Sequence, residues 1–287
     1  MRTEKEIFDL IINIAKDDEL LRAAIMTGSR TSPDSPKDKY QDYDILYIVR
    51  EKKDISPYYN NIEWLEKHFG KPLIMQLPEN MSKEICPPDG DGHFTALMLF
   101  NDGVRIDLTI DDNYIDDGEH TLVLFDKDGR FRSMNPDTKH WHVKPPVPKA
   151  FHDCCNEFWW CLNNVAKGIA RDELPFAMNM YNTIVREMHD KMVEWYIGIE
   201  NDFSVSVGKS GKYFKRYLSP ELYTKYAATY SDSDYNNFWK AIFTACELFH
   251  HVAVKIAEHL NIKYNQDEED GMIKYLNSVK SDSTINF

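Results

Sequence analysis

Long apolar runs are missing from this chain of 287 residues. No stretch approaches the roughly 20 consecutive apolar residues that cross a bilayer as one helix. The opening residues, 1 to 6, are mostly charged or polar and do not form the apolar segment of a secretory signal. We therefore expect a cytoplasmic protein with no membrane partner.

An excess of positive charge is also missing. The chain has 34 Lys and Arg against 47 Asp and Glu, which gives a formal net charge of −13. Such an acidic protein is poorly suited to nonspecific contact with nucleic acid or anionic lipid, and it favours a cationic small molecule. We predict no nucleic-acid partner, and the composition leaves the oligomeric state open.

A paired-cysteine motif and the glycine-rich P-loop motif are both absent. The five cysteines include no Cys-x-x-Cys spacing, so we expect free thiols in place of disulfides or a zinc site. The spacing Gly-x-x-x-x-Gly-Lys-Ser/Thr does not occur either, which excludes a P-loop. Any nucleotide chemistry must therefore use another kind of phosphate site.

The pattern of short elements changes near residue 145. Before it, a helix is predicted over 3 to 16, with Thr3 and Glu6 as its capping box, and another over 62 to 69. Strands are predicted near 22 to 27, 45 to 49, 73 to 76, 94 to 100 and 104 to 110. The segment 144 to 148 contains three prolines, and helices are predicted beyond it over 150 to 171, 175 to 198, 220 to 229 and 234 to 260. The tail after Lys263 is expected to be peripheral. We predict an α+β protein with a mixed-sheet domain over 1 to 144 and a helical bundle over 145 to 287.

A glycine turn and a pair of carboxylates follow two of the predicted strands. Gly28 and Ser29 end the first, and Asp42 and Asp44 stand at the start of the second. Residues two apart in a strand face the same side, so both carboxylates can bind one divalent cation. Mg²⁺ is such a cation, and it takes phosphate oxygens of a substrate as its other ligands. Gly28 permits close approach of a triphosphate, Ser29 offers a hydroxyl, and Arg30 offers a cationic fork. These residues predict a nucleotide site.

A third carboxylate lies in the second strand of a predicted hairpin, in which the turn Asn101-Asp102-Gly103 joins strands 94 to 100 and 104 to 110. Asp107 shares one face of its strand with Arg105 and Thr109, while the alternate residues are apolar. If this strand lies beside strand 45 to 49, Asp107 joins Asp42 and Asp44. It would then bind metal or take the proton from an attacking hydroxyl. Taken singly, each motif also fits ordinary turn chemistry; the three in this order favour catalysis.

Two features of the helical half are candidate binding elements. Asp153, Glu157 and Trp160 share one stripe of the helix 150 to 171, where two carboxylates and an indole suit a polycationic sugar. A solvated face with Trp160 in an interdomain contact is the alternative. The basic run around Lys209 and Lys212 would reach a triphosphate, or it is a solvated loop.

The order of these segments resembles the aminoglycoside 6-adenylyltransferases, the streptomycin-modifying branch of the polymerase-beta-like nucleotidyltransferases. Segments that carry the resemblance are Gly28-Ser29-Arg30-Thr31, Gln41-Asp42-Tyr43-Asp44-Ile45, Asp107-Leu108-Thr109, Cys154-Cys155-Asn156-Glu157-Phe158-Trp159, Lys167-Gly168-Ile169-Ala170-Arg171 and Lys215-Arg216-Tyr217-Leu218. The resemblance covers nearly the whole chain. It implies a sheet domain followed by a helical domain, with ATP and antibiotic bound between them.

The resulting hypothesis is Mg²⁺-dependent transfer of AMP from ATP to a streptomycin hydroxyl, the 6-position by resemblance, which gives antibiotic resistance. ATP would bind Gly28 and Ser29, with Mg²⁺ on Asp42 and Asp44, and Asp107 would act as the base. Glu157 is the alternative base. Other hypotheses are a nucleotidyltransferase acting on a protein or another small molecule, and a binding module without turnover.

Overall fold

The structure is a computed structural model that describes residues 2–33, 35–87, 92–114, 118, 120–134 and 138–282. The chain divides into two compact units, Met1–Asp137 and Thr138–Phe287. None of the helices in the described part of the chain is both long and apolar enough to cross a membrane.

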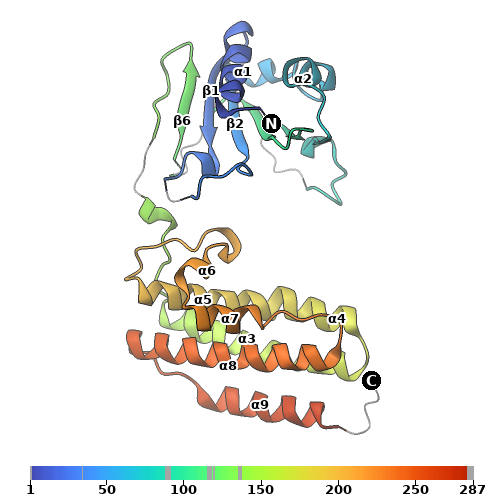
Figure 1. Cartoon of the computed structure of the whole chain (residues 1–287), viewed down its shortest axis with the longest axis vertical. Helices are drawn as coiled ribbons and strands as arrows, with labels where there is room; N and C mark the ends of the chain where they lie inside the picture. Colours follow the sequence, from blue (N-terminus) through green and yellow to red (C-terminus); the bar gives the residue numbers. More distant parts are fainter. Residues whose placement is uncertain are drawn as a thin grey trace. The chain divides into compact units, whose positions relative to one another are not determined.

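The first unit is built on a six-stranded mixed sheet with the order β3-β4-β5-β2-β1-β6 (Figure 1). Its strands are β1 (Leu21–Thr27), β2 (Tyr43–Val49), β3 (Ile74–Gln76), β4 (Phe94–Leu99), β5 (Arg105–Asp111) and β6 (Leu122–Asp126). The central pair β2 and β5 is parallel, and the other neighbours are antiparallel. The predicted hairpin is therefore β4 and β5, and it lies beside β2 as the sequence required.

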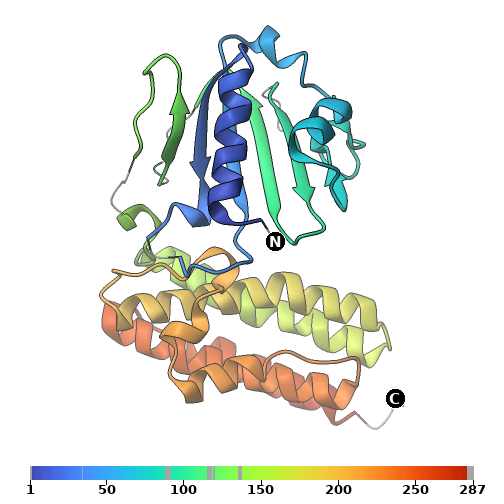
Figure 2. The ribbon, with the colours of Figure 1, turned by 45° about the horizontal axis from the view of Figure 1, so that its top comes forward.

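Helices α1 (Glu4–Asp17) and α2 (Ile62–Phe69) cover one face of this sheet (Figure 2). The Thr3 side chain and the Glu6 carboxylate form the predicted capping box of α1. The helices bury Ile7, Ile11 and Leu65 against the alternate strand residues Ile106 and Leu108, and all five are fully buried. The intervening strand residues, Asp107 among them, therefore point to the opposite face.

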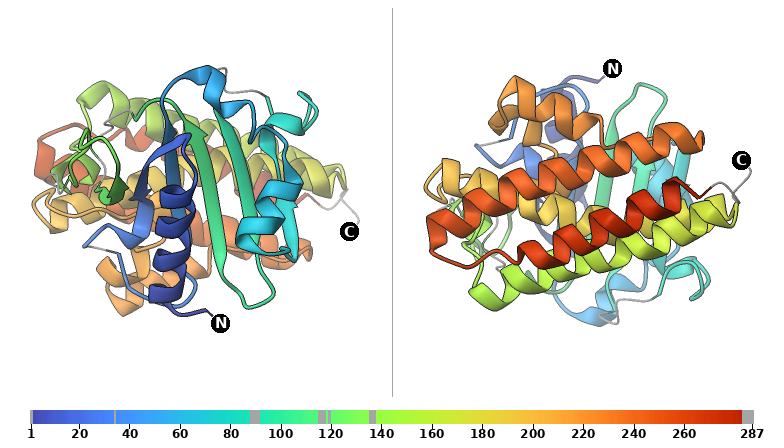
Figure 3. Two further views of the ribbon diagram at one scale, coloured as in Figure 1. Left: turned by 90° about the horizontal axis from the view of Figure 1, so that it is seen from above. Right: turned by 90° about the horizontal axis from the view of Figure 1, so that it is seen from below.

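The second unit is helical. Its helices are α3 (Pro148–Ala170), α4 (Leu174–Asn179), α5 (Arg186–Glu200), α6 (Phe214–Tyr217), α7 (Pro220–Ala227), α8 (Tyr235–Leu260) and α9 (Gln266–Lys280). A π-helical stretch, Met180–Val185, joins α4 to α5, so the predicted helix 175 to 198 is continuous but irregular. Figure 3 shows α9 lying along α3, with α8 on its other side.

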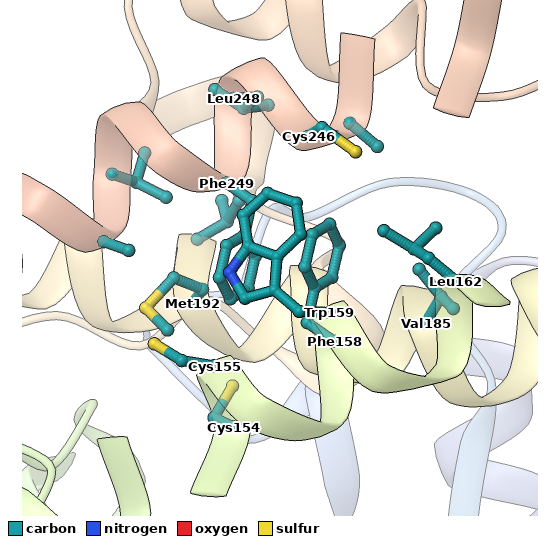
Figure 4. Packing of buried hydrophobic residues seen from close by; sticks show 14 of the residues in the cluster. Cys154, Cys155, Phe158, Trp159, Leu162, Val185, Met192, Cys246, Leu248 and Phe249 are labelled. Carbon is teal, nitrogen blue, oxygen red and sulfur yellow. The ribbon is translucent and has the colours of Figure 1, made fainter. Parts of the chain in front are cut away.

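Aromatic side chains fill the centre of the helical unit (Figure 4). The rings of Phe158 on α3 and Phe249 on α8 stack with centroids 3.8 Å apart, and Trp159 meets Phe249 edge-on at 5.6 Å. Offset and edge-on ring pairs add about 0.5–1.5 kcal/mol beyond the apolar area they bury. These contacts tie α3 to α8 and fix which side of α3 faces outward.

The expected α+β class, with a mixed-sheet half followed by a helical half, is confirmed. Two details differ from the sequence prediction. Strand β6 was not predicted, and the tail after Lys263, expected to be peripheral, contains α9, whose Leu276 is fully buried. The expected domain boundary after residue 144 stays a prediction. All five cysteines are free thiols, as expected, and four of them are buried.

Candidate active site

Gly28 begins a short 3₁₀ turn, Gly28–Arg30, directly after β1. Its φ of +74° lies in the left-handed region that glycine adopts without strain. A Cβ atom placed on it would lie only 2.0 Å from Asp44 Oδ2 on the neighbouring strand. Glycine at this position thus lets the backbone of the turn pack directly on the Asp44 carboxylate.

Two side chains clamp this turn to the segment that enters β2. The Gln41 amide donates to the Ser29 carbonyl at 3.0 Å and to its hydroxyl at 3.3 Å. The Arg30 guanidinium donates to the carbonyls of Gln41 and Asp42 at 2.9 and 3.1 Å, and it stacks 3.8 Å from the centre of the Tyr43 ring. In this conformation Arg30 therefore fixes the backbone around Asp42. Its predicted contact with a triphosphate stays a prediction.

Three carboxylates meet where β2 and β5 begin. Asp44 and Asp107 are direct partners in the parallel pairing of these strands, and Thr27 is the partner of Asp44 on its other side. Asp42 precedes Asp44 by two residues and so belongs to the same side. The structure thus brings together Gly28, Asp44 and Asp107 on the sheet face that α1 and α2 leave uncovered.

Arg105 lies among these carboxylates. Its Nε and one terminal nitrogen donate to the two oxygens of Asp107 at 2.8 and 2.6 Å, and its other terminal nitrogen is 3.5 Å from Asp42 Oδ2. The hydrogen bond to Asp107 raises the pKa of Arg105. Burial raises the pKa of Asp42, with a smaller rise from Asp107 and opposing effects of Arg105 and Arg30. The site concentrates negative charge that a cation must balance.

The donor chemistry of the site fits a hard divalent cation. Carboxylate oxygens are the ligands that Mg²⁺ prefers, and Asp42, Asp44 and Asp107 supply them from adjacent strand ends. In the conformation described, Arg105 is the cation that holds Asp107 and Asp42. Within the described ranges, no three His, Cys, Asp or Glu side chains are already arranged as a metal site. The assignment of these carboxylates as Mg²⁺ ligands rests on their donor chemistry and stays a prediction.

The predicted substrate face lies on α3 in the helical unit. Asp153 forms an exposed ion pair with Lys149 one turn earlier, at 2.8 Å. Glu157 is half-buried and accepts a hydrogen bond from the Cys161 thiol at 3.3 Å. The indole of Trp160 is 64% exposed. The helix presents these side chains along one stripe, and their contact with a substrate stays a prediction.

The basic loop adopts a tight, glycine-dependent shape. Lys209–Gly211 is a 3₁₀ turn, and both Gly208 and Gly211 have positive φ. The side chains of Lys209 and Lys212 are exposed, and the Lys212 ammonium lies 5.1 Å from the Tyr213 ring. These two lysines offer charge to an anion, and their role at a triphosphate stays a prediction.

Sequence reasoning missed two contributors to the site. Arg105 was placed on the face of Asp107, yet nothing local indicated that it would bind two carboxylates. Gln41 was noted only as part of a motif, while the structure shows it holding the Ser29 backbone. The local signal that could have indicated the contact with Asp107 is the spacing of two residues between Arg105 and Asp107, because alternation puts both side chains on the same face of the strand. No such signal pointed to Asp42.

Known proteins resemble this chain along most of its length. The family model described as streptomycin adenylyltransferase matches residues 1–279. A Bacillus subtilis (strain 168) protein named aminoglycoside 6-adenylyltransferase is 37% identical over 286 residues, which cover 97% of this chain and 98% of that protein. A Campylobacter jejuni protein of the same name is 37% identical over 270 residues, 92% of this chain and 91% of its own.

A solved structure also matches. The crystal structure of an aminoglycoside 6-adenyltransferase from Bacillus subtilis has 33% sequence identity, covers 98% of this chain and 100% of its own, and gives a TM-score of 0.48. The resemblance inferred from the sequence motifs is confirmed by the family model and the curated relatives. Because that family model spans nearly all of the chain, the chain belongs to the streptomycin adenylyltransferase family and is an adenylyltransferase.

Proposed function

We propose that this protein transfers AMP from ATP to a hydroxyl group of a streptomycin-type aminoglycoside and releases pyrophosphate. The observation that carries the proposal is the packing of the Gly28 turn on Asp44, beside Asp107 on the adjacent parallel strand. A glycine turn offers backbone close to a triphosphate, and the carboxylates offer ligands for the cation that accompanies it. Family membership supports the same reaction.

The proposed division of labour follows from the positions of the side chains. Asp42 and Asp44 would hold Mg²⁺, which when bound screens the charge of the triphosphate and of the pyrophosphate that leaves. The Gly28 and Ser29 backbone would position the triphosphate, with Gln41 and Arg30 keeping the turn in place. Asp107 would be a further ligand of the cation and would accept the proton of the attacking hydroxyl. Most of the rate enhancement would come from positioning and electrostatic stabilisation.

The acceptor is proposed from charge. The protein carries a net charge of −13, and an aminoglycoside is a polycation. Glu157 and Trp160 on α3 would bind its cationic groups through an ion pair and a cation–π contact, with Asp153 contributing after release from Lys149. The 6-hydroxyl and antibiotic resistance are proposed because the relatives are named aminoglycoside 6-adenylyltransferases.

The identity of the base is tested by two isosteric substitutions. We expect Asp107→Asn to lower kcat by about a hundredfold or more, since it removes the proton acceptor and one anionic group. Glu157→Gln should mainly raise KM for the aminoglycoside. Steady-state kinetics with both substrates varied separate these effects. If Asp107→Asn keeps substantial turnover while Glu157→Gln abolishes it with binding retained, Glu157 is the base.

The α3 face is tested by Trp160→Ala. Loss of an exposed indole that contacts a cation is expected to raise KM for the aminoglycoside about three- to tenfold with kcat nearly unchanged. Phe176→Ala, which also removes a large exposed aromatic ring from the helical unit, serves as a control with no expected effect. Equal kinetics for the two variants would mean that the α3 face does not bind the substrate.

The deciding experiment measures pyrophosphate release from Mg-ATP by the purified protein, with and without streptomycin, followed by mass spectrometry of the antibiotic. Streptomycin-dependent release with one added adenylyl mass is expected, and chelation of divalent cations should abolish it. Pyrophosphate release with no change in the mass of streptomycin or related aminoglycosides would point to a protein or another small-molecule acceptor.

A further inference from the structure

Arg105 stands where the carboxylates of the site need a cation. Its guanidinium makes a two-pronged contact with Asp107 at 2.6 and 2.8 Å and lies 3.5 Å from Asp42. Burial raises the pKa of Asp42, and the charge of Asp107 raises it further, so the two carboxylates disfavour each other's ionised form. A single arginine therefore pairs with Asp107 and Asp42, and after the hydrogen bond to Asp107 the charge of Asp44 also raises the pKa of Arg105.

The guanidinium and a divalent cation compete for these carboxylates. Arginine has donors only and always carries its charge, so it repels a second cation held by the same oxygens. Both oxygens of Asp107 accept hydrogen bonds from the guanidinium, and these are the oxygens that would ligate a divalent cation. Binding of a cation by Asp107 would therefore displace at least one of these hydrogen bonds.

Arg105 is free to move in a way that its neighbour Arg30 is not. The Arg105 side chain is 45% exposed, while that of Arg30 is 11% exposed. Arg30 is held by two backbone carbonyls and by stacking on Tyr43. In the part of the chain that the structure describes, the Arg105 side chain makes ion pairs with Asp107 and Asp42 and no hydrogen bond to the backbone. Departure of the guanidinium therefore breaks only contacts with carboxylates.

We propose that Arg105 is a displaceable counter-ion. It keeps Asp42 and Asp107 close together before the nucleotide arrives, and it swings away from Asp107 when the divalent cation binds. Arg105 is thus a positioning residue that acts through the carboxylates, and it lowers the affinity of the empty site for free metal. This inference rests on the proposed function, because it requires Asp42, Asp44 and Asp107 to be the metal ligands.

The test uses Mn²⁺ as a spectroscopic probe, titrated into the full-length protein and followed by electron paramagnetic resonance without nucleotide. Arg105→Gln removes the charge and keeps most of the side-chain length. We expect it to bind Mn²⁺ about tenfold more tightly than the unmodified protein, because no ion pair must be broken first. A residue with a purely structural role would leave the affinity unchanged or weaken it.

A second readout is thermal stability in buffer from which divalent metal has been removed with a chelating resin. Arg105→Gln should lower the melting temperature by about 2–5 °C, since the carboxylates lose their counter-ion, and added Mn²⁺ should restore it. Arg22→Gln is the matched control, because Arg22 on β1 makes a similar bidentate pair with Asp128, in the bend that follows β6. It should lose stability without any recovery on addition of Mn²⁺.

The outcomes separate this inference from the proposed function. If Arg105→Gln binds Mn²⁺ no more tightly than the unmodified protein, while Asp44→Asn abolishes binding, Arg105 is not a displaceable counter-ion and the metal site stands. If Asp44→Asn binds Mn²⁺ as well as the unmodified protein, the metal assignment fails, and the inference fails with it. Should Arg105→Gln not fold, Arg105→Lys replaces it, with an expected smaller gain in affinity because a single ammonium cannot form the fork.

Discussion

Replacing Asp44 with asparagine is expected to lower kcat/KM for adenylyl transfer by about a thousandfold or more. The side chain keeps its shape, so the packing against Gly28 and the pairing of β2 with β5 should survive. What is lost is one of the charges that would hold the cation of Mg-ATP. The measurement is pyrophosphate release with saturating ATP and streptomycin, together with circular dichroism to show that the fold is intact.

Asp111→Asn is the control for this substitution. Asp111 lies on the same strand as Asp107, and its carboxylate pairs with Lys52. Burial raises the pKa of Asp111, but the hydrogen bonds from Lys52 and Asp112 outweigh it, so the pKa is lowered. We expect Asp111→Asn to change activity only a few-fold. If the Asp44 variant turns over as fast as the Asp111 variant, the carboxylates beside Gly28 are not the catalytic centre.

Gly28→Ala should reduce activity by about a hundredfold while the protein still folds. The new Cβ would stand 2.0 Å from Asp44 Oδ2, so either the turn or the carboxylate must shift. A displacement of about 1 Å at a reacting centre can cost two orders of magnitude in rate. A positive φ for alanine adds strain of about 1–3 kcal/mol. The measurements are kcat, KM for ATP and the melting temperature.

Gly129→Ala is the control that separates backbone strain at a positive φ from the steric clash of the new Cβ with Asp44. Gly129 has a φ of +63°, and a Cβ on it would meet nothing within 4 Å. It should lose stability by a similar amount through the backbone and keep its activity. Loss of activity in both variants would trace the effect to stability alone, and full activity in Gly28→Ala would show that the turn does not position the nucleotide.

The local pattern of the sequence determined much of this protein. Apolar alternation around Asp107 and the turn at 101 to 103 predicted the hairpin of β4 and β5, and the capping box at Thr3 predicted the start of α1. These features succeed because a strand or a helix end is specified by residues within a few positions of one another. The spacing of Gly28, Asp42 and Asp44 was local in the same sense, and it pointed to the motifs that the family model then matched.

Tertiary structure alone decided how these local pieces meet. The pairing of Asp44 with Asp107 depends on the register of two parallel strands, and a shift of one residue would turn one of these carboxylates to the other face. The same register puts Arg105 beside Asp42. Helix α9, whose first turn carries three acidic residues, is stabilised mainly by packing on α3. Such contacts join residues far apart in the chain, so no local pattern specifies them.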